Sequence, residues 1–124
     1  MKTLRALHLN AHAKTIIEVQ IDAKNTLKEM QDAVGGLIEV GFDWPDNRHT
    51  AYVNEEGMFG EHEDWVLIQG APNPFKGNAI ICGFNPKNGE TVGCLLTLEE
   101  VKGKVKFLDT GTARLYIWNA PIGQ

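Results

Sequence analysis

The sequence contains no serine and only two cysteines among its 124 residues. Nucleophilic catalysis needs a serine, a cysteine or a similar group beside a positioned base, so serine hydrolase chemistry is excluded. Cys82 and Cys94 lie in apolar segments, where burial makes a thiol less reactive. Two cysteines in a chain of this length do not form a disulfide framework, and we expect two reduced, buried thiols. A disulfide between them stays open as an alternative, because the segment between them has the pattern of a hairpin.

Long hydrophobic runs and strong net charge are missing as well. No segment approaches the ~20 apolar residues of a membrane-spanning helix, and the first residues lack the pattern of a signal peptide. The formal net charge is −4, from 12 basic and 16 acidic residues. Because nonspecific binding of nucleic acid needs clustered lysine and arginine, nucleic acid is not the expected partner. A cytoplasmic protein without membrane contact is the prediction.

The segment Thr26–Phe42 is the centre of the predicted fold. Thr26 and Glu29 have the spacing of a capping box, in which both side chains bind free N–H groups at the start of a helix. Apolar residues recur at three- and four-residue spacing and predict a helix over Thr26–Val34. The face expected to be buried carries Leu27, Met30 and Val34.

The helix is followed by a predicted turn and a strand. Gly35 suits the left-handed residue that ends a helix, and Gly36 allows the chain to turn sharply. Ile38, Val40 and Phe42 then alternate with other residues in the two-residue period of a strand. Further along the chain, Thr97 and Glu100 repeat the capping pattern and predict a second, short helix near Thr97.

The remaining segments predict mainly short strands separated by strong turn signals. Asn54 to Gly57 has the composition of a tight turn, and the sequence NPKNG after Phe84 is a hairpin signal. The result is an α+β fold in one domain, residues 1–124, with a mostly antiparallel curved sheet packed on the helix Thr26–Val34. The predicted strands are Thr3–Leu9, Lys14–Ile21, His49–Val53, Trp65–Gln69, Asn78–Phe84, Glu90–Leu96, Lys104–Leu108 and Arg114–Trp118.

Four segments in fixed order resemble a known family. They are Thr26–Gly41, VNEEG at Val53–Gly57, GAPNPFKGNAIICG at Gly70–Gly83, and LTLEEVKGKVKFLD at Leu96–Asp109. The chain resembles the family known only as domain of unknown function 3846, whose members look like small proteins of phages, plasmids and other mobile elements. The resemblance implies an accessory protein and brings no catalytic residue or cofactor. It marks as pattern positions Gly35, Gly36, Asn54, Glu55, Gly57, Gly77 and Gly83, each interpretable as a turn or cap.

Candidate sites for ions are weak. The segment Gly60–Asp64 holds Glu61, His62 and Glu63, which are ligand-type residues. A metal site usually draws ligands from defined spacings or several segments, so a solvated acidic loop is favoured and cation binding stays an alternative. Gly35 and Gly36 lie at the carbonyl end of the predicted helix, whereas phosphate sites use the N–H end. No metal or cofactor is expected.

Aromatic residues in loops are the more suggestive feature, because aromatic side chains are enriched where proteins contact partners. Trp44 beside Pro45 and Phe75 in the proline-rich loop are the first candidates for a partner surface, since such loops lie outside. Phe59 and Trp118 are further candidates. Trp65 and Tyr116 are expected to fill the core, and Trp118 has this second interpretation too.

The leading functional prediction is a non-enzymatic accessory protein that binds a host or phage protein and modulates host defence or metabolism. A homodimer is plausible through the strand Arg114–Trp118, because an edge strand offers unpaired backbone groups. The alternative is a protein that binds a small molecule or nucleotide. Its pocket is then expected between the sheet and the irregular loop Gly70–Gly77.

Overall fold

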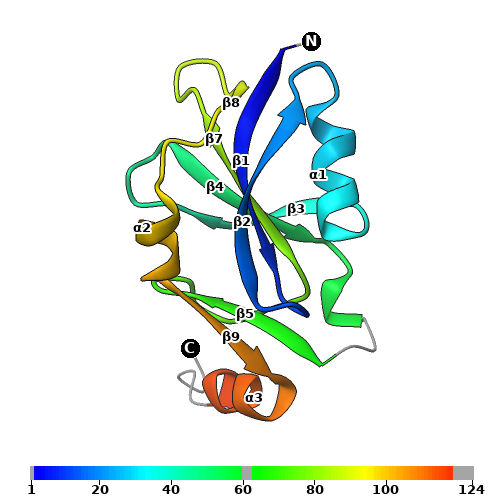
Figure 1. The fold of residues 1–124 in the computed structure, drawn as a ribbon. Helices are drawn as coiled ribbons and strands as arrows, with labels where there is room; N and C mark the ends of the chain where they lie inside the picture. Colours follow the sequence, from blue (N-terminus) through cyan, green and yellow to red (C-terminus); the bar gives the residue numbers. More distant parts are fainter. Residues whose placement is uncertain (1, 60–62, 119–124) are drawn as a thin grey trace.

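The computed structural model describes residues 2–59 and 63–118 and contains two antiparallel sheets and three α-helices (Figure 1). The elements in chain order are β1 (Thr3–Asn10), β2 (Thr15–Asp22), α1 (Thr26–Val34), β3 (Ile38–Asp43), β4 (His49–Asn54), the 3₁₀ turn η1 (Gly57–Phe59), β5 (Asp64–Ile68), β6 (Phe75–Lys76), β7 (Ala79–Phe84), β8 (Thr91–Val92), α2 (Leu98–Lys102), β9 (Val105–Asp109) and α3 (Thr110–Trp118).

The larger sheet has the strand order β2-β1-β7-β4-β3, and β8 pairs with the end of β7. β1 and β2 form a long hairpin in which Thr3 lies opposite Asp22. β3 pairs with β4 with a register shift between Val40 and Phe42, which is where a bulge places one extra residue in a strand. A second sheet has the order β6-β5-β9. The predicted α+β class is therefore confirmed.

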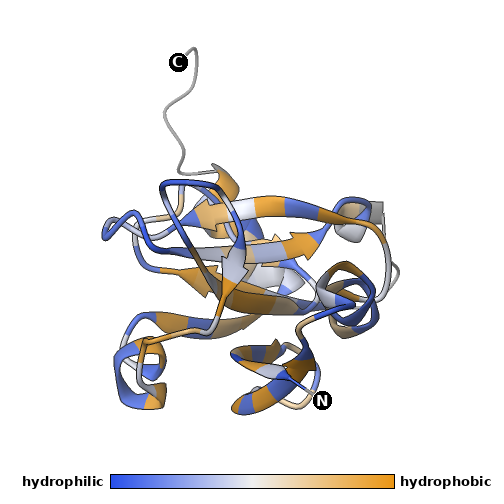
Figure 2. Cartoon of the chain, turned by 90° about the horizontal axis from the view of Figure 1, so that it is seen from above, coloured by the Kyte–Doolittle hydropathy of each residue, from blue (hydrophilic) through white to orange (hydrophobic). Residues whose placement is uncertain are grey.

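Both faces of the larger sheet are covered. Along the strands next to the N-terminus, hydrophobic and hydrophilic positions alternate (Figure 2), because successive side chains of a strand point to opposite faces. On one face, α1 covers a cluster of Ala6, Ile21, Met30, Val34, Ile80 and Cys82. On the other, β5, β9 and α2 add Val66, Ile68, Val105, Phe107 and Val101 to a cluster with Leu7, Leu9, Ala51 and Ile81.

The N-terminus of α1 differs from the prediction. Asn25 occupies the N-cap position without a side-chain cap bond, and Thr26 is the first helical residue. Glu29 Oε1 accepts a hydrogen bond from the Asp22 N–H at 3.1 Å, so the carboxylate binds the strand that leads into the helix and not the helix start. Met30 and Val34 are buried as expected, but Leu27 is 56% exposed because it lies at the open end of α1.

The C-terminus of α1 and the start of α2 have the local chemistry that the sequence predicts. Gly35 is left-handed, with φ of 85°, and its N–H bonds the carbonyl of Gln31. Thr97 Oγ1 accepts a hydrogen bond from the Glu100 N–H at 3.1 Å and caps α2. Both are short-range effects, so a sequence pattern is enough to find them.

The predicted strand Arg114–Trp118 is wrong, because the segment belongs to α3. Asp109 Oδ1 accepts a hydrogen bond from the Thr112 N–H at 2.7 Å and satisfies a free donor of the first turn. Ala113 is fully buried and anchors the helix beside β9, at the end of the molecule farthest from the N-terminus (Figure 1). The dimer prediction that used this segment as a strand edge therefore loses its basis.

One further segment is less regular than predicted, and another is more regular. Of Glu90–Leu96, only β8 (Thr91–Val92) is a strand, and the rest runs as an extended connection to α2. The loop Gly70–Gly77 contains a short strand, because Phe75 and Lys76 of β6 pair with β5.

Candidate functional site

A cleft of about 410 Å³ opens where five segments meet. We call it the α1 cleft, because the C-terminal end of α1 forms one side of it. The turn after β1, the turn between β4 and η1, the start of β5, and the connection from β6 to β7 form the remainder. Its lining residues are Ala11, His12, Val34, Gly35, Asn54, Glu56, Gly57, Asp64, Lys76, Gly77 and Asn78.

Hydrogen bonds fix the polar groups of the cleft. His12 Nδ1 and Asp64 Oδ2 lie 3.2 Å apart and join the β1–β2 turn to β5. Asn78 Oδ1 accepts from the Ala11 N–H at 2.9 Å, and Asn54 Oδ1 accepts from the Glu56 N–H at 2.8 Å. The lining therefore combines carboxylates, amides, an imidazole and an ammonium group, which suits a polar ligand better than an apolar one.

The pattern glycines have steric or conformational reasons to be glycine. A Cβ on Gly57 would lie 2.5 Å from the Lys76 carbonyl oxygen, and one on Gly83 would lie 2.5 Å from the Gly93 carbonyl oxygen. Both distances are shorter than real Cβ contacts, so the backbones can approach only without a side chain. A Cβ on Gly36 would lie 2.9 Å from Asn54 Nδ2, and Gly35 and Gly77 have positive φ.

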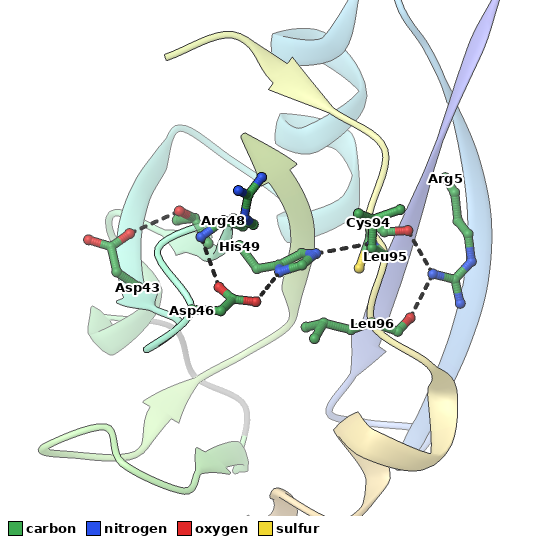
Figure 3. Close-up of polar contacts among 9 residues, drawn as sticks. Arg5, Asp43, Asp46, Arg48, His49, Cys94, Leu95 and Leu96 are labelled. Atoms are coloured by element: carbon green, nitrogen blue, oxygen red, sulfur yellow. Dashed lines mark hydrogen bonds and ion pairs between the residues drawn. The ribbon is translucent and has the colours of Figure 1, made fainter. Parts of the chain in front are cut away.

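A second polar cluster centres on His49 (Figure 3). Its Nε2 accepts a hydrogen bond from the Leu95 N–H at 3.0 Å. A neutral imidazole that accepts at Nε2 carries its proton on Nδ1, which lies 2.7 Å from Asp46 Oδ2 and donates to it. Because both nitrogens are occupied and His49 is 3% exposed, this pair holds the chain in place and has no free position for substrate.

Arg5 also binds the stretch that connects β8 to α2, to which Leu95 belongs. Its Nη1 donates to the carbonyl oxygens of Cys94 and Leu96 at 2.8 and 2.7 Å (Figure 3). The side chain also pairs with Glu18, and this hydrogen bond raises the pKa of Arg5 despite its partial desolvation. The stretch between β8 and α2 is thus tied to both β1 and β4.

The two cysteines are free and lie in different core clusters. Cys82 packs under α1, with its Sγ 3.6 Å from Met30 Sδ. Cys94 packs on the opposite face of the sheet. In the pairing of β7 with β8, Val92 lies opposite Gly83, and Cys82 is not paired with Cys94. Desolvation raises the pKa of Cys82 to about 12, so the thiol is inert. The open question of a disulfide is answered for this structure, because each thiol packs in a separate cluster.

Of the four aromatic candidates for a partner surface, the structure describes the side chains of Trp44 and Phe75, and both pack against the core. Trp44 is 6% exposed, because the chain before Pro45 turns inward and its ring packs against Phe42 at a centroid distance of 5.5 Å. Phe75 is half-buried against the same core cluster. Phe59 belongs to η1 and Trp118 to α3, but both side chains lie outside what the structure describes. Trp65 is buried, as expected.

Among the described residues, the longest run of consecutive exposed large apolar side chains is instead on α3. Leu115, Tyr116 and Ile117 are 61, 41 and 37% exposed, so the prediction of a core position for Tyr116 is wrong. α3 reaches the sheet through Ala113 and through a hydrogen bond from Trp65 Nε1 to Thr110 Oγ1 at 2.9 Å. No pattern of helical amphipathicity marked this segment, because its apolar residues are consecutive.

A groove of about 340 Å³ lies beside Tyr116. Leu67 and Val105 contribute apolar surface and Tyr116 borders it from α3. Lysines make up much of the rest: Lys102, Lys104 and Lys106. We call the groove together with Leu115, Tyr116 and Ile117 the α3 surface.

Within residues 2–59 and 63–118, no three histidine, cysteine or acidic side chains gather in a way that could hold a metal ion. Of the predicted acidic loop Gly60–Asp64, residues 60–62 lie outside the described part, and Asp64 is in β5. Among the helices described, none is both long and apolar enough to cross a membrane.

Comparison with known proteins gives one match. The family model described as Domain of unknown function (DUF3846) matches residues 4–106. No curated protein and no solved structure matches. The matched range includes every residue that lines the α1 cleft, whereas α3 lies beyond it.

Proposed function

Because the chain belongs to the DUF3846 family, whose description states no function, we propose a function from its surfaces: it binds another protein through the α3 surface. The observation that carries this proposal is the run of three exposed apolar side chains, Leu115 to Ile117, of which Tyr116 borders the groove. In keeping with the family resemblance, we assign it the role of a mobile-element accessory factor acting on a host or phage protein.

Physical reasons support the choice of this surface. Contiguous exposed apolar area is uncommon on soluble proteins and marks sites of association. Tyrosine is enriched among the residues that contribute most to binding, and Tyr116 combines an exposed ring with an adjacent groove. α3 contacts the small sheet through Ala113 and through the hydrogen bond from Trp65 to Thr110, and its large apolar side chains stay partly exposed.

Affinity capture with matched variants tests the proposal. Leu115→Ser with Ile117→Ser removes the apolar anchors, and Leu27→Ser is the control because Leu27 is similarly exposed on α1. We expect the wild-type chain and the Leu27 variant to retain the same protein, and the α3 variant to lose it. Identical recovery with all three chains would contradict the assignment of this surface.

A second function, binding of a small polar molecule in the α1 cleft, is favoured by one observation. Residues that carry the family resemblance come from separate segments and line one cleft, namely Gly35, Asn54, Gly57 and Gly77. The whole cleft lies in the range that the family model matches, so we propose this second function for the family. α3 lies outside that range, so binding through the α3 surface is proposed for this chain alone.

A thermal-shift screen with nucleotides and metabolites tests this second function. A ligand present at about 100 times its Kd stabilises the fold by about 2.7 kcal/mol. His12→Ala is the informative variant, because this side chain is 91% exposed and its loss leaves the core intact. We expect a ligand-induced shift that the variant reduces, and no shift across the panel would remove the cleft as a site.

A further inference from the structure

The charge of the chain is distributed unevenly. Residues 101–118 hold four of the twelve basic residues but one of the sixteen acidic ones. The first hundred residues hold eight basic and fifteen acidic residues. A moderately acidic protein therefore has a segment with an excess of positive charge, which follows Glu99 and Glu100 of α2 and contributes three lysines to the α3 surface.

Among residues 2–59 and 63–118, none of the four cations of this region forms an ion pair with a carboxylate. No carboxylate lines the groove beside Lys102 and Lys106. Lys104 is different, because its ammonium lies 5.9 Å from the centroid of the Trp44 ring and contacts that aromatic face.

We infer that the partner at the α3 surface is an acidic amphipathic segment of another protein, with carboxylates toward Lys102 and Lys106 and apolar side chains against Tyr116 and Leu115. The inference rests on the proposed protein-binding function and specifies its partner. Amphipathic helices commonly bind by placing an apolar face in a groove. Complementary charge at the rim then adds specificity and speeds association.

The charge of the rest of the molecule favours a short acidic segment over nucleic acid. A nucleic acid is a long polyanion and extends past the groove toward the rest of the chain, whose first hundred residues hold fifteen acidic residues against eight basic ones. Repulsion acts there within a Debye length, about 8 Å at physiological salt. A short segment confined to the groove avoids this repulsion and uses the apolar side chains, which a phosphate backbone does not.

The test uses a synthetic peptide whose helical pattern places leucines on one face and glutamates on the other. A control peptide replaces each glutamate by glutamine. Backbone amide spectra of the labelled full chain are recorded during titration with each peptide. We expect the acidic peptide to shift the resonances of residues 102–106 and 115–117, with a Kd at least about tenfold lower than that of the glutamine peptide.

Charge variants separate a specific contact from general attraction. Lys102→Glu with Lys106→Glu should weaken acidic-peptide binding at least about tenfold, and the same positions changed to Arg should retain it. Lys87→Glu is the control, because Lys87 is exposed in the β7–β8 turn, far along the chain from α3. Equal weakening by the Lys87 variant would overturn the inference.

The remaining outcomes are decisive too. Equal binding of both peptides, or shifts confined to other residues, would exclude an acidic partner. Tighter binding of a single-stranded DNA oligonucleotide at the same residues would assign the surface to nucleic acid, and a concentration-dependent dimer that the Lys102 and Lys106 reversals abolish would assign it to a second copy. If serine at Leu115 and Ile117 abolishes protein capture but the charge reversals do not, the proposed function stands and the acidic partner fails.

Discussion

The buried His49 forms a hydrogen bond with the partly exposed Asp46 at the turn that joins β3 to β4. His49 Nδ1 donates to Asp46 Oδ2 over 2.7 Å, while His49 Nε2 accepts from the Leu95 N–H at 3.0 Å. One imidazole therefore links the β3–β4 turn to the connection before α2. Because α2 contributes fully buried Val101 to the core, this link contributes to stability.

Replacing His49 by Ala should destabilise the fold markedly. The change leaves a cavity and removes the acceptor of the Leu95 N–H, and a lost buried hydrogen-bond partner costs about 1–3 kcal/mol. Chemical unfolding measures the loss, and the Leu95 amide should exchange its proton faster. His12→Ala is the control, because it removes a side chain that is 91% exposed. An equal effect of both variants would contradict the structural role of His49.

The charge of Asp46 should give stability that depends on pH. Partial burial opposes its ionisation, but hydrogen bonds from the Arg48 N–H and from His49 outweigh this effect and lower the pKa of Asp46 from its usual 3.8. A carboxyl group with a lower pKa in the folded state stabilises the fold above its unfolded pKa. That contribution is lost as the pH falls through the folded pKa.

Asp46→Asn should therefore reduce stability at neutral pH, by roughly 0.2–1 kcal/mol since the carboxylate is partly solvent-screened. The difference from wild type should shrink as the pH falls below 3.8. Urea unfolding over a pH series measures it. A difference that stays constant, or grows in acid, would show that the charge of Asp46 is not the cause.

Gly57→Ala should be unfavourable because of space and not because of φ. Its Cβ would lie 2.5 Å from the Lys76 carbonyl oxygen, so β6 or η1 must shift. We expect a loss of about 1–3 kcal/mol, the range of overpacking. Gly103→Ala is the matched control, because Gly103 has right-handed helical geometry and its nearest contact is 3.5 Å. A neutral Gly57→Ala variant would contradict the close approach of the two backbones.

Cys82 should not react with thiol reagents in the folded protein. Desolvation raises its pKa to about 12, so almost no thiolate is present at mildly alkaline pH, and α1 shields the sulfur. A chromogenic thiol reagent should label Cys82 only after denaturant is added. Mass spectrometry of the unreduced protein should find both cysteines as free thiols. Rapid labelling of the native chain at Cys82, or a Cys82–Cys94 peptide, would contradict the packing.

Local chemistry explains which elements could be predicted from the sequence. The hairpin at NPKNG, the left-handed Gly35 and the Thr97 cap depend on neighbouring residues, so short patterns identify them. α3 was missed because its apolar residues favour strands. The side chain of Asp109 caps α3. In the sequence, however, Asp109 begins the stretch DTGT, which has the composition of an ordinary turn.

Tertiary packing explains the rest. A proline beside Trp44 indicated an exposed loop, but the core cluster that also contains Ile68 and Val101 takes up the ring. The α1 cleft combines five segments, and the pairing of His12 with Asp64 spans 52 residues. No local pattern indicates such contacts. The face of α3 that carries Ala113 is buried. This placement decides which side chains of α3 are exposed on the α3 surface.

Site-specific photo-crosslinking can show whether a partner contacts the α3 surface. A photoreactive phenylalanine analogue replaces Tyr116 in one chain and Lys87, in an exposed turn, in another. After irradiation in cells that carry the gene, we expect one discrete protein adduct at position 116 and none at position 87. No adduct at position 116, or the same adducts at both positions, would contradict partner binding through the α3 surface.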